Sequence, residues 1–178
     1  MLISETYRSV ISQAHREDER WGTSSPTYAL LISKLINTHG IRTVLDYGCG
    51  KGRLAEALDV DHQIAIYRYD IGIPELSKAP RPCELVVCTD VLEHVEPDCI
   101  DAVLDDIRRC AKRIAFIAIS LVPARKILPD GRNAHIMLRQ SDWWIRKLLL
   151  YFDIGWLLSD RSSITFVATR KDGHNNLR

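Results

Sequence analysis

The apolar positions along the chain alternate between helical and strand-like spacing. Two stretches with apolar residues at helical spacing stand near the N-terminus, and a serine followed by proline precedes the second of them. Short apolar runs bounded by turn residues come next and are expected to be strands. The two expected helices cover residues 3–20 and 25–40, and the expected strands cover residues 43–47, 63–69, 85–88 and 114–122.

Further helices separate and follow these strands. They are expected at residues 53–58, 97–112 and 141–151, the second with acids in its first turn and bases in its last. Two more apolar runs, 154–158 and 164–169, flank a polar turn and predict a terminal hairpin. Strands that alternate with helices predict an α/β fold with a mostly parallel sheet, closed by a C-terminal antiparallel hairpin.

The first expected strand runs directly into a glycine-rich turn. The sequence VLDYGCGKG at 44–52 has the spacing GxGxG, with glycines at 48, 50 and 52. Such a turn lets a ligand approach main-chain N–H groups at the start of a helix. The dinucleotide fingerprint GxGxxG has its third glycine one residue later. The strand also contains Asp46, an acid suited to a cationic ligand group that a pyrophosphate lacks, so a zwitterionic, amino-acid-bearing cofactor is expected.

A second motif, LVVCTDVLEHV at 85–95, is an apolar strand that ends in an Asp-x-Leu-Glu-His turn. Together the two motifs resemble those of the class I S-adenosylmethionine-dependent methyltransferases. The resemblance implies a Rossmann-like sandwich with S-adenosylmethionine as the cofactor. Within that class the chain is similar to small single-domain enzymes of bacteria and their phages, a likeness that identifies no substrate.

The resemblance also implies a set of cofactor-binding residues. Asp70 ends the second strand, where the family's acid accepts hydrogen bonds from both ribose hydroxyls. A turn-forming aspartate is the alternative for this position. The expected cofactor-binding residues are Asp46, Gly48, Cys49, Gly50, Asp70, Thr89 and Asp90.

The chain between Asp70 and Leu85 is short. Only 14 residues intervene, too few for the helix, strand and second helix that the family places there. The family's third strand is therefore expected to be reduced or missing, which leaves six principal strands. The usual adenine-pocket residues, which follow that strand, are not carried over to this chain.

A polar loop after the long apolar strand is expected on the acceptor side of the site. The sequence LPDGRNAH at 128–135 has no periodicity, and two indoles follow closely. A local turn around Asn133 and a core tryptophan are the alternative. His135 is the first candidate for a general base and Asp90 the second. For Asp90, Glu93 and His94, contact with a substrate or cofactor and a polar loop in which a backbone carbonyl satisfies His94 remain equally open. The expected substrate-binding residues are His94, Asp130, Asn133, His135, Trp143 and Trp144.

Composition adds mainly exclusions. The net charge of +1 predicts no general attraction to nucleic acid or anionic membranes, and no apolar run is long enough to span a membrane. Five cysteines without a CxxC pair indicate reduced thiols and a cytoplasmic protein. No zinc-ligand spacing is present, so no metal is expected. The chain also lacks the tetrapeptide typical of amino-methylating DNA enzymes.

These observations predict one methyltransferase domain over residues 1–170, with N-terminal helices at 1–40, a core at 41–170 and a disordered tail at 171–178. The expected reaction is in-line transfer of a methyl group to an unidentified acceptor, and the oligomeric state stays open. Two alternatives remain. One is a methyltransferase-like binding or regulatory subunit without catalysis, and the other is a different Rossmann nucleotide-cofactor enzyme, which the GxGxG spacing disfavours.

Overall fold

The computed structural model describes residues 1–23 and 25–171. All of the predicted tail except Lys171 therefore lies outside the described residues. None of the described helices is long and apolar enough to cross a bilayer. The helices are α1 Glu5–Glu17, α2 Ala29–His39, α3 Leu54–Ala57, α4 Ile100–Cys110 and α5 Ser141–Leu148. The strands are β1 Thr43–Tyr47, β2 Ala65–Tyr69, β3 Cys83–Thr89, β4 Ala111–Ser120, β5 Phe152–Ser159 and β6 Ser163–Arg170.

The six strands form one sheet in the order β2-β1-β3-β4-β6-β5. The first four strands in this order are parallel, whereas β6 runs antiparallel to β4 and pairs with β5 as a hairpin. The predicted mostly parallel sheet with a C-terminal antiparallel hairpin is confirmed. Residues 74–76 form only a single 3-10 turn beyond β2, which confirms that the described part of the chain has six strands and lacks the outer third strand.

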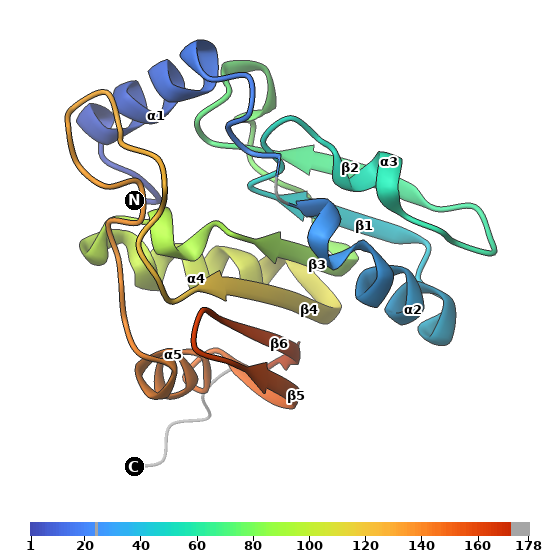
Figure 1. Ribbon diagram of the computed structural model, residues 1–178. Helices are drawn as coiled ribbons and strands as arrows, with labels where there is room; N and C mark the ends of the chain where they lie inside the picture. Colours follow the sequence, from blue (N-terminus) through green and yellow to red (C-terminus); the bar gives the residue numbers. More distant parts are fainter. Residues whose placement is uncertain (24, 172–178) are drawn as a thin grey trace.

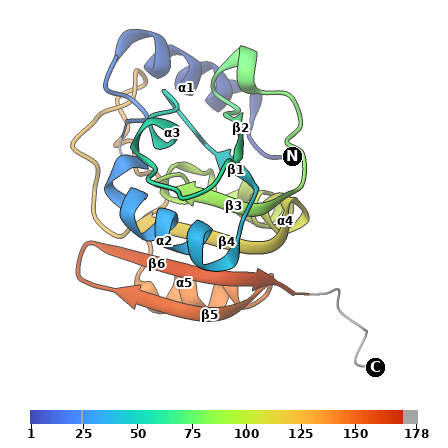
Figure 2. The ribbon, with the colours of Figure 1, turned by 90° about the vertical axis from the view of Figure 1, so that its right-hand side faces the viewer.

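Helices cover both faces of the sheet (Figures 1 and 2). On one face, α2 and α3 pack on the central strands through residues such as Ile36 and Leu54, both fully buried. On the other face, α4 and α5 bury Leu104 and Trp144 against the same strands and the hairpin. Central strands covered on both faces become nearly continuous apolar runs, as the sequence of β4 shows.

Helix α1 belongs to neither layer. It packs through Tyr7, Ile11 and Ala14 against Trp21 and the loop after β4, which contributes Leu128. In Figure 1 this helix, drawn in dark blue, stands beyond the carboxyl ends of the parallel strands, next to the orange loop. Ligand sites of open α/β sheets lie at this edge, so α1 and the loop cover the place where a ligand is expected.

Several element boundaries differ from the predicted ones. Residues 25–28 form a 3-10 turn, and α2 begins only at Ala29. Residues 97–99 likewise form a 3-10 turn before α4. Strand β4 begins at Ala111, directly after α4 ends, so residues 111–113 belong to the strand and not to the helix or its end. The predicted type of each element is nevertheless the observed one.

Candidate functional site

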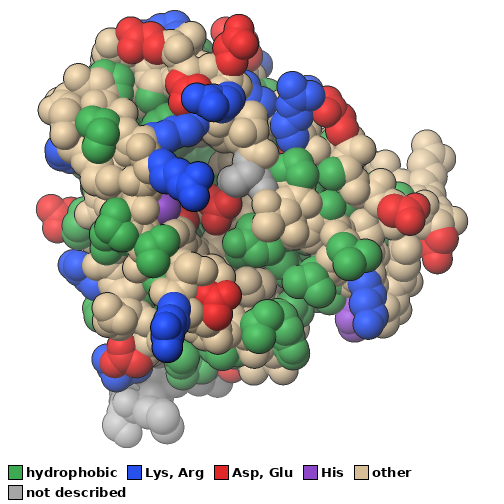
Figure 3. Space-filling model, viewed as in Figure 1, with side chains coloured by type: hydrophobic (Ala, Val, Ile, Leu, Met, Phe, Trp, Pro, Cys, Tyr) green, Lys and Arg blue, Asp and Glu red, His purple; other side chains and the backbone are tan. Residues whose placement is uncertain are grey.

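A cavity of about 780 Å³ lies at the carboxyl edge of the parallel strands. Its wall includes the glycine turn after β1, the residues that follow β2, β3 and β4, and the underside of α1. Figure 3 shows this face hollowed near its centre, with Lys and Arg side chains beside the opening. Arg20, Arg125 and Lys126 are the basic residues that line it. One cavity thus reaches the predicted cofactor site and the predicted acceptor side.

The glycine turn has a left-handed backbone that other residues adopt only with strain. Gly48 has φ 77° and Gly50 has φ 50°. A Cβ atom on Gly48 would lie 2.3 Å from the Val91 side chain, and one on Gly50 would lie 2.5 Å from main-chain atoms of Gly22. The N–H groups of Gly48 and Cys49 donate to the Tyr69 carbonyl at 2.8 and 3.0 Å, which fixes the turn beside the end of β2. Cys49 itself is buried and does not line the cavity.

Gly22 is a site residue that the sequence analysis missed. The segment before α2 crosses the glycine turn, and the Lys51 N–H donates to the Gly22 carbonyl at 3.0 Å. The Lys51 ammonium also donates to the His15 carbonyl at the end of α1. The contacts of Gly22 join residues that are far apart in the chain, so no local sequence pattern predicts them. A Trp-Gly pair is also too common in sequences to indicate a site residue.

The Asp70 carboxylate lies at the end of β2 and lines the cavity. One oxygen accepts from the Gly50 N–H at 2.9 Å, and the other accepts from the Gly72 N–H at 2.9 Å. His15 Nε2 lies 3.6 Å from the second oxygen. Burial, as the largest cause, lowers the pKa of His15 although Asp70 opposes it, so this imidazole is neutral at neutral pH. Asp70 is therefore held in place by main-chain donors and keeps lone pairs for a ligand hydroxyl.

The Asp46 carboxylate lies beneath the glycine turn and does not line the cavity, unlike Tyr47 and Gly48. It is only 2% exposed, and its Oδ2 has no hydrogen-bond partner among the described residues. Burial, and secondly the charge of Asp70, raise the pKa of Asp46 to about 7, while Arg68 opposes the rise. An orphaned buried carboxylate oxygen below a glycine cradle fits a ligand that brings positive charge.

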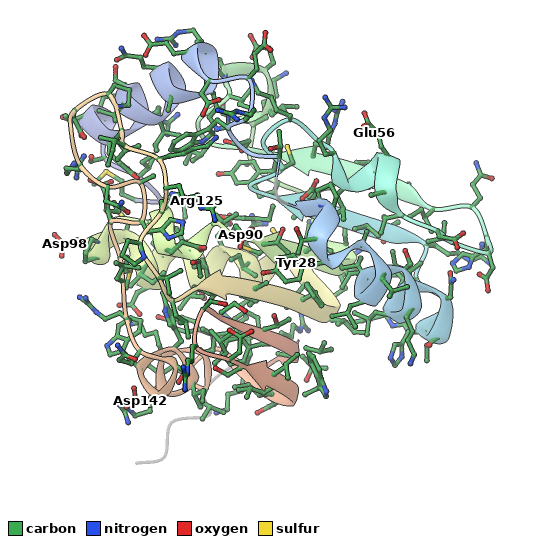
Figure 4. All side chains as sticks on the ribbon, viewed as in Figure 1. Tyr28, Glu56, Asp90, Asp98, Arg125 and Asp142 are labelled. Carbon is green, nitrogen blue, oxygen red and sulfur yellow. The ribbon has the colours of Figure 1, made fainter. Side chains whose placement is uncertain are left out.

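We expect the substitution Asp46→Asn to stabilise the protein increasingly as pH rises. The folded pKa of about 7 exceeds the ordinary value of 3.8, so the folded state loses stability as pH rises from about 4 through 7. A rise in the pKa from 3.8 to about 7 corresponds to a loss of folding free energy on the order of 2–4 kcal/mol above the folded pKa. Urea unfolding of both proteins at pH 5 and pH 8, without cofactor, measures it. Asp98→Asn, an exposed site marked in Figure 4, is the control. A stability difference that does not change with pH would contradict the assignment.

Asp90 follows β3 and has φ 53°, a left-handed conformation that is unusual for a residue other than glycine. Its carboxylate lines the cavity and lies near Tyr28 and Arg125 in Figure 4. Burial first, and then the charges of Asp90 and Glu93, raise the pKa of Tyr28. Thr89, at the end of β3, is buried and does not line the cavity. Of these two predicted cofactor residues, only Asp90 is presented to a ligand.

Two histidines meet on the acceptor side of the cavity. The rings of His94 and His135 contact edge to face with 4.8 Å between their centroids. His94 Nδ1 lies 2.7 Å from the Ala134 carbonyl oxygen, and His135 Nδ1 lies 2.6 Å from that of Val122. Burial first, and then His135, lower the pKa of His94 to about 4, so His94 is neutral at neutral pH. Both rings line the cavity, as predicted for acceptor-side residues.

The rest of the predicted acceptor loop has structural contacts instead. Asp130 forms an ion pair with Arg132 at 2.6 Å, and neither residue lines the cavity. The Asn133 side chain bonds both the N–H and the carbonyl of Ala124, and its oxygen also accepts from the His135 N–H. Asn133 thus positions His135 from outside the cavity, in the local turn that was the alternative interpretation.

The predicted aromatic wall of Trp143 and Trp144 is not present. Both residues belong to α5; Trp144 is fully buried in the core, and Trp143 packs against the same core, so neither lines the cavity. Trp21 and Tyr7, from the N-terminal segment, line the cavity in their place. Trp21 lies 5.8 Å from the His94 ring, and the Tyr7 hydroxyl donates to the His94 carbonyl. Tyr7 lies within the first expected helix, at residues 3–20, and nothing in the sequence indicated that this helix borders a ligand site.

Comparison with known proteins agrees with this geometry. Residues 14–157 match a family model described as a methyltransferase domain. No curated protein matches the chain in sequence. Because the family model covers most of the chain, the protein belongs to this methyltransferase family, and its fold is Rossmann-like.

Solved structures with the same fold are only distantly similar. The 1,6-didemethyltoxoflavin-N1-methyltransferase of Burkholderia thailandensis, with bound S-adenosylhomocysteine, is 16% identical at a TM-score of 0.62, over 93% of this chain and 87% of that one. The magnesium protoporphyrin IX methyltransferase of Synechocystis, also with S-adenosylhomocysteine, is 19% identical at 0.55, over 82% and 83%. A 16S rRNA methylase is 12% identical at 0.53, over 90% and 91%. At these identities the likeness extends to the fold and not to an acceptor.

Proposed function

We propose that the cavity holds S-adenosylmethionine at its glycine end and the methyl acceptor at its histidine end. The observation that carries this proposal is the single cavity lined by Gly48, Gly50 and Asp70 on one side and by His94 and His135 on the other. In this arrangement the Asp70 carboxylate binds the ribose hydroxyls, and the glycine turn with Asp46 beneath it accommodates the amino-acid end. Cys49 and Thr89 contribute main chain only, whereas Asp90 borders both ends.

The bound cofactor supplies an activated methyl group, so the chain has to hold the acceptor in line with it and manage one proton. Positioning of this kind contributes up to roughly 7–11 kcal/mol in favourable cases. The Nδ1 atom of His135 faces a carbonyl oxygen, which only accepts hydrogen bonds. The proton of a neutral His135 therefore sits on Nδ1, and Nε2 carries a lone pair able to take the acceptor's proton. Asp90 is the second candidate for this role. Trp21 and Tyr7 give this end of the cavity an aromatic lining.

We expect Asp70→Asn to weaken binding of S-adenosylhomocysteine about ten- to a hundredfold. A neutral amide loses charge-assisted hydrogen bonds to the ribose, which are worth roughly 1.5–3 kcal/mol. Calorimetry of the purified wild type should show one site per chain, and Asp142→Asn, an exposed site on α5, serves as the control. Unchanged affinity in Asp70→Asn, or tighter binding of NAD than of S-adenosylhomocysteine by the wild type, would overturn the proposed cofactor site.

The acceptor itself has to be found by experiment. Incubation with methyl-labelled S-adenosylmethionine and host extract, fractionated into small molecules, proteins and nucleic acids, assigns the label to one class. The five cysteines are free and buried, which supports the cytosol as the place to search. Absence of label in every fraction, with cofactor binding intact, would instead favour a binding or regulatory role.

A further inference from the structure

Three side chains that can ligate a metal converge at the histidine end of the cavity. Glu93, His94 and His135 each offer one ligand atom, and these atoms lie within 4.8 Å of one another. The first two residues belong to a 3-10 turn after β3, and the third lies in the loop between β4 and α5. Sequence spacing alone gave no reason to expect a metal, because the ligands come from two distant segments.

The two histidines are oriented as metal ligands usually are. Each ring has Nδ1 within 2.7 Å of a main-chain carbonyl oxygen, so the proton of the neutral ring is on Nδ1 and the lone pair is on Nε2. Metal-binding histidines typically donate their other N–H to such a carbonyl, which fixes the ring and its tautomer. The Nε2 atom of each ring therefore presents a lone pair that a metal ion can accept.

Glu93 is a buried carboxylate that lacks a complete set of partners. It is fully buried, and its Oε1 accepts from the Ser120 N–H at 2.8 Å. Its Oε2 has no hydrogen-bond partner among the described residues. A buried carboxylate oxygen without a hydrogen-bond partner is unfavourable, and a cation bound to that oxygen would offset the cost.

We propose that Glu93, His94 and His135 bind one divalent transition-metal ion, of the Zn²⁺, Mn²⁺ and Co²⁺ class. Imidazole and carboxylate ligands suit these ions, and three protein ligands leave coordination positions open. Metal–nitrogen bonds of about 2.0–2.1 Å bring ligand atoms to roughly 3–3.5 Å from each other, so the side chains close in by about an ångström or more.

This proposal rests on the proposed function and specifies how the acceptor is held. An acceptor hydroxyl in an open coordination position loses its proton more readily, and the Asp90 carboxylate, which borders the same cavity, takes that proton. The oxygen lone pair then forms the bond to the methyl carbon, while the sulfur keeps the electron pair of the bond that breaks. His135 acts as a ligand in the metal-loaded protein, and the ion replaces it as the group that activates the acceptor.

The experiment is a Co²⁺ titration of tag-free, EDTA-treated protein, followed by calorimetry and by visible absorption of the bound ion. We expect one Co²⁺ per chain, displaced by Zn²⁺, and a loss of affinity of about a hundredfold or more in His135→Gln and Glu93→Gln. His39→Gln, at the exposed end of α2, is the control and should bind as the wild type does. Glu93 is buried, so Glu93→Gln can fail to fold. His135 is partly exposed, so His135→Gln tests the metal site in that case.

Binding of S-adenosylhomocysteine in EDTA, measured on the same preparations, separates this proposal from the proposed function. Cofactor binding without Co²⁺ binding, or Co²⁺ affinity unchanged in both variants, would overturn the metal site and leave the methyltransferase site intact. One Co²⁺ per chain that depends on His135 and Glu93 would support the metal site, even if S-adenosylhomocysteine failed to bind.

Discussion

The substitution His135→Ala is expected to reduce methyl transfer by about 10²–10⁴-fold and to leave the affinity for S-adenosylhomocysteine nearly unchanged. His135 lines the acceptor end of the cavity and makes no contact with the glycine turn. Its loss removes the group that activates the acceptor, whether the imidazole takes the proton itself or holds a metal ion that binds the acceptor while Asp90 takes the proton. Single-turnover assays with the acceptor that the labelling experiment identifies measure the transfer rate, and calorimetry measures cofactor affinity.

Two further variants show whether the effect is local. His39→Ala, on the surface of α2, should retain wild-type transfer. Asn133→Ala should lose transfer as well, but with a lower melting temperature, because Asn133 ties Ala124 and the His135 N–H together from outside the cavity. If His135→Ala transfers methyl groups at the wild-type rate, the histidine end has only a structural role. A large loss of cofactor affinity would instead place His135 on the cofactor side.

Gly50→Ala should weaken S-adenosylhomocysteine binding about 10–100-fold and destabilise the fold, whereas Gly40→Ala should leave that affinity unchanged and destabilise the fold less. The two glycines have similar left-handed backbones, with φ 50° and 59°, so the conformational strain of alanine, about 1–2 kcal/mol, is common to both. Their surroundings differ. A Cβ on Gly50 would lie 2.5 Å from Gly22, while a Cβ on Gly40 would meet no atom within 4 Å. Overpacking against a backbone adds roughly 1–3 kcal/mol.

Urea unfolding and calorimetry on both variants measure the difference. Gly22→Ala offers an independent check, since its Cβ would lie 2.7 Å from the Gly50 main chain and should have the same effect as Gly50→Ala. Equal stability and equal cofactor affinity in Gly50→Ala and Gly40→Ala would contradict the close approach of the two chain segments.

The fold followed from the sequence more readily than the site did. Strand β1 was predicted with its observed bounds, and the short segment after Asp70 correctly indicated a missing strand, because both rest on local spacing and chain length. Helix starts were less accurate, since 3-10 turns such as residues 97–99 resemble the first turn of an α-helix in sequence.

Within the site, residues that follow the parallel strands lie at the expected edge, because the geometry of a parallel sheet brings the strand ends together, whereas Asp46 and Thr89, inside β1 and β3, do not line the cavity. Asp70, Asp90 and His94 all line the cavity. Residues beyond the strands were harder to place. Whether Trp144 or Trp21 lines the cavity depends on how α1 packs against the loop after β4. No short sequence pattern predicts this packing.

The missing outer strand leaves β2 at the margin of the sheet, where unpaired backbone groups invite association with another chain. Two features of this chain oppose such association. Arg81, from the segment that replaces the strand, stacks over the Tyr67 ring at 4.5 Å, and the exposed Arg68 adds a second positive charge on β2. The edge of β2 is thus protected against aggregation by positive charge and not by backbone pairing with another strand. Neutral residues at positions 68 and 81 would remove that protection.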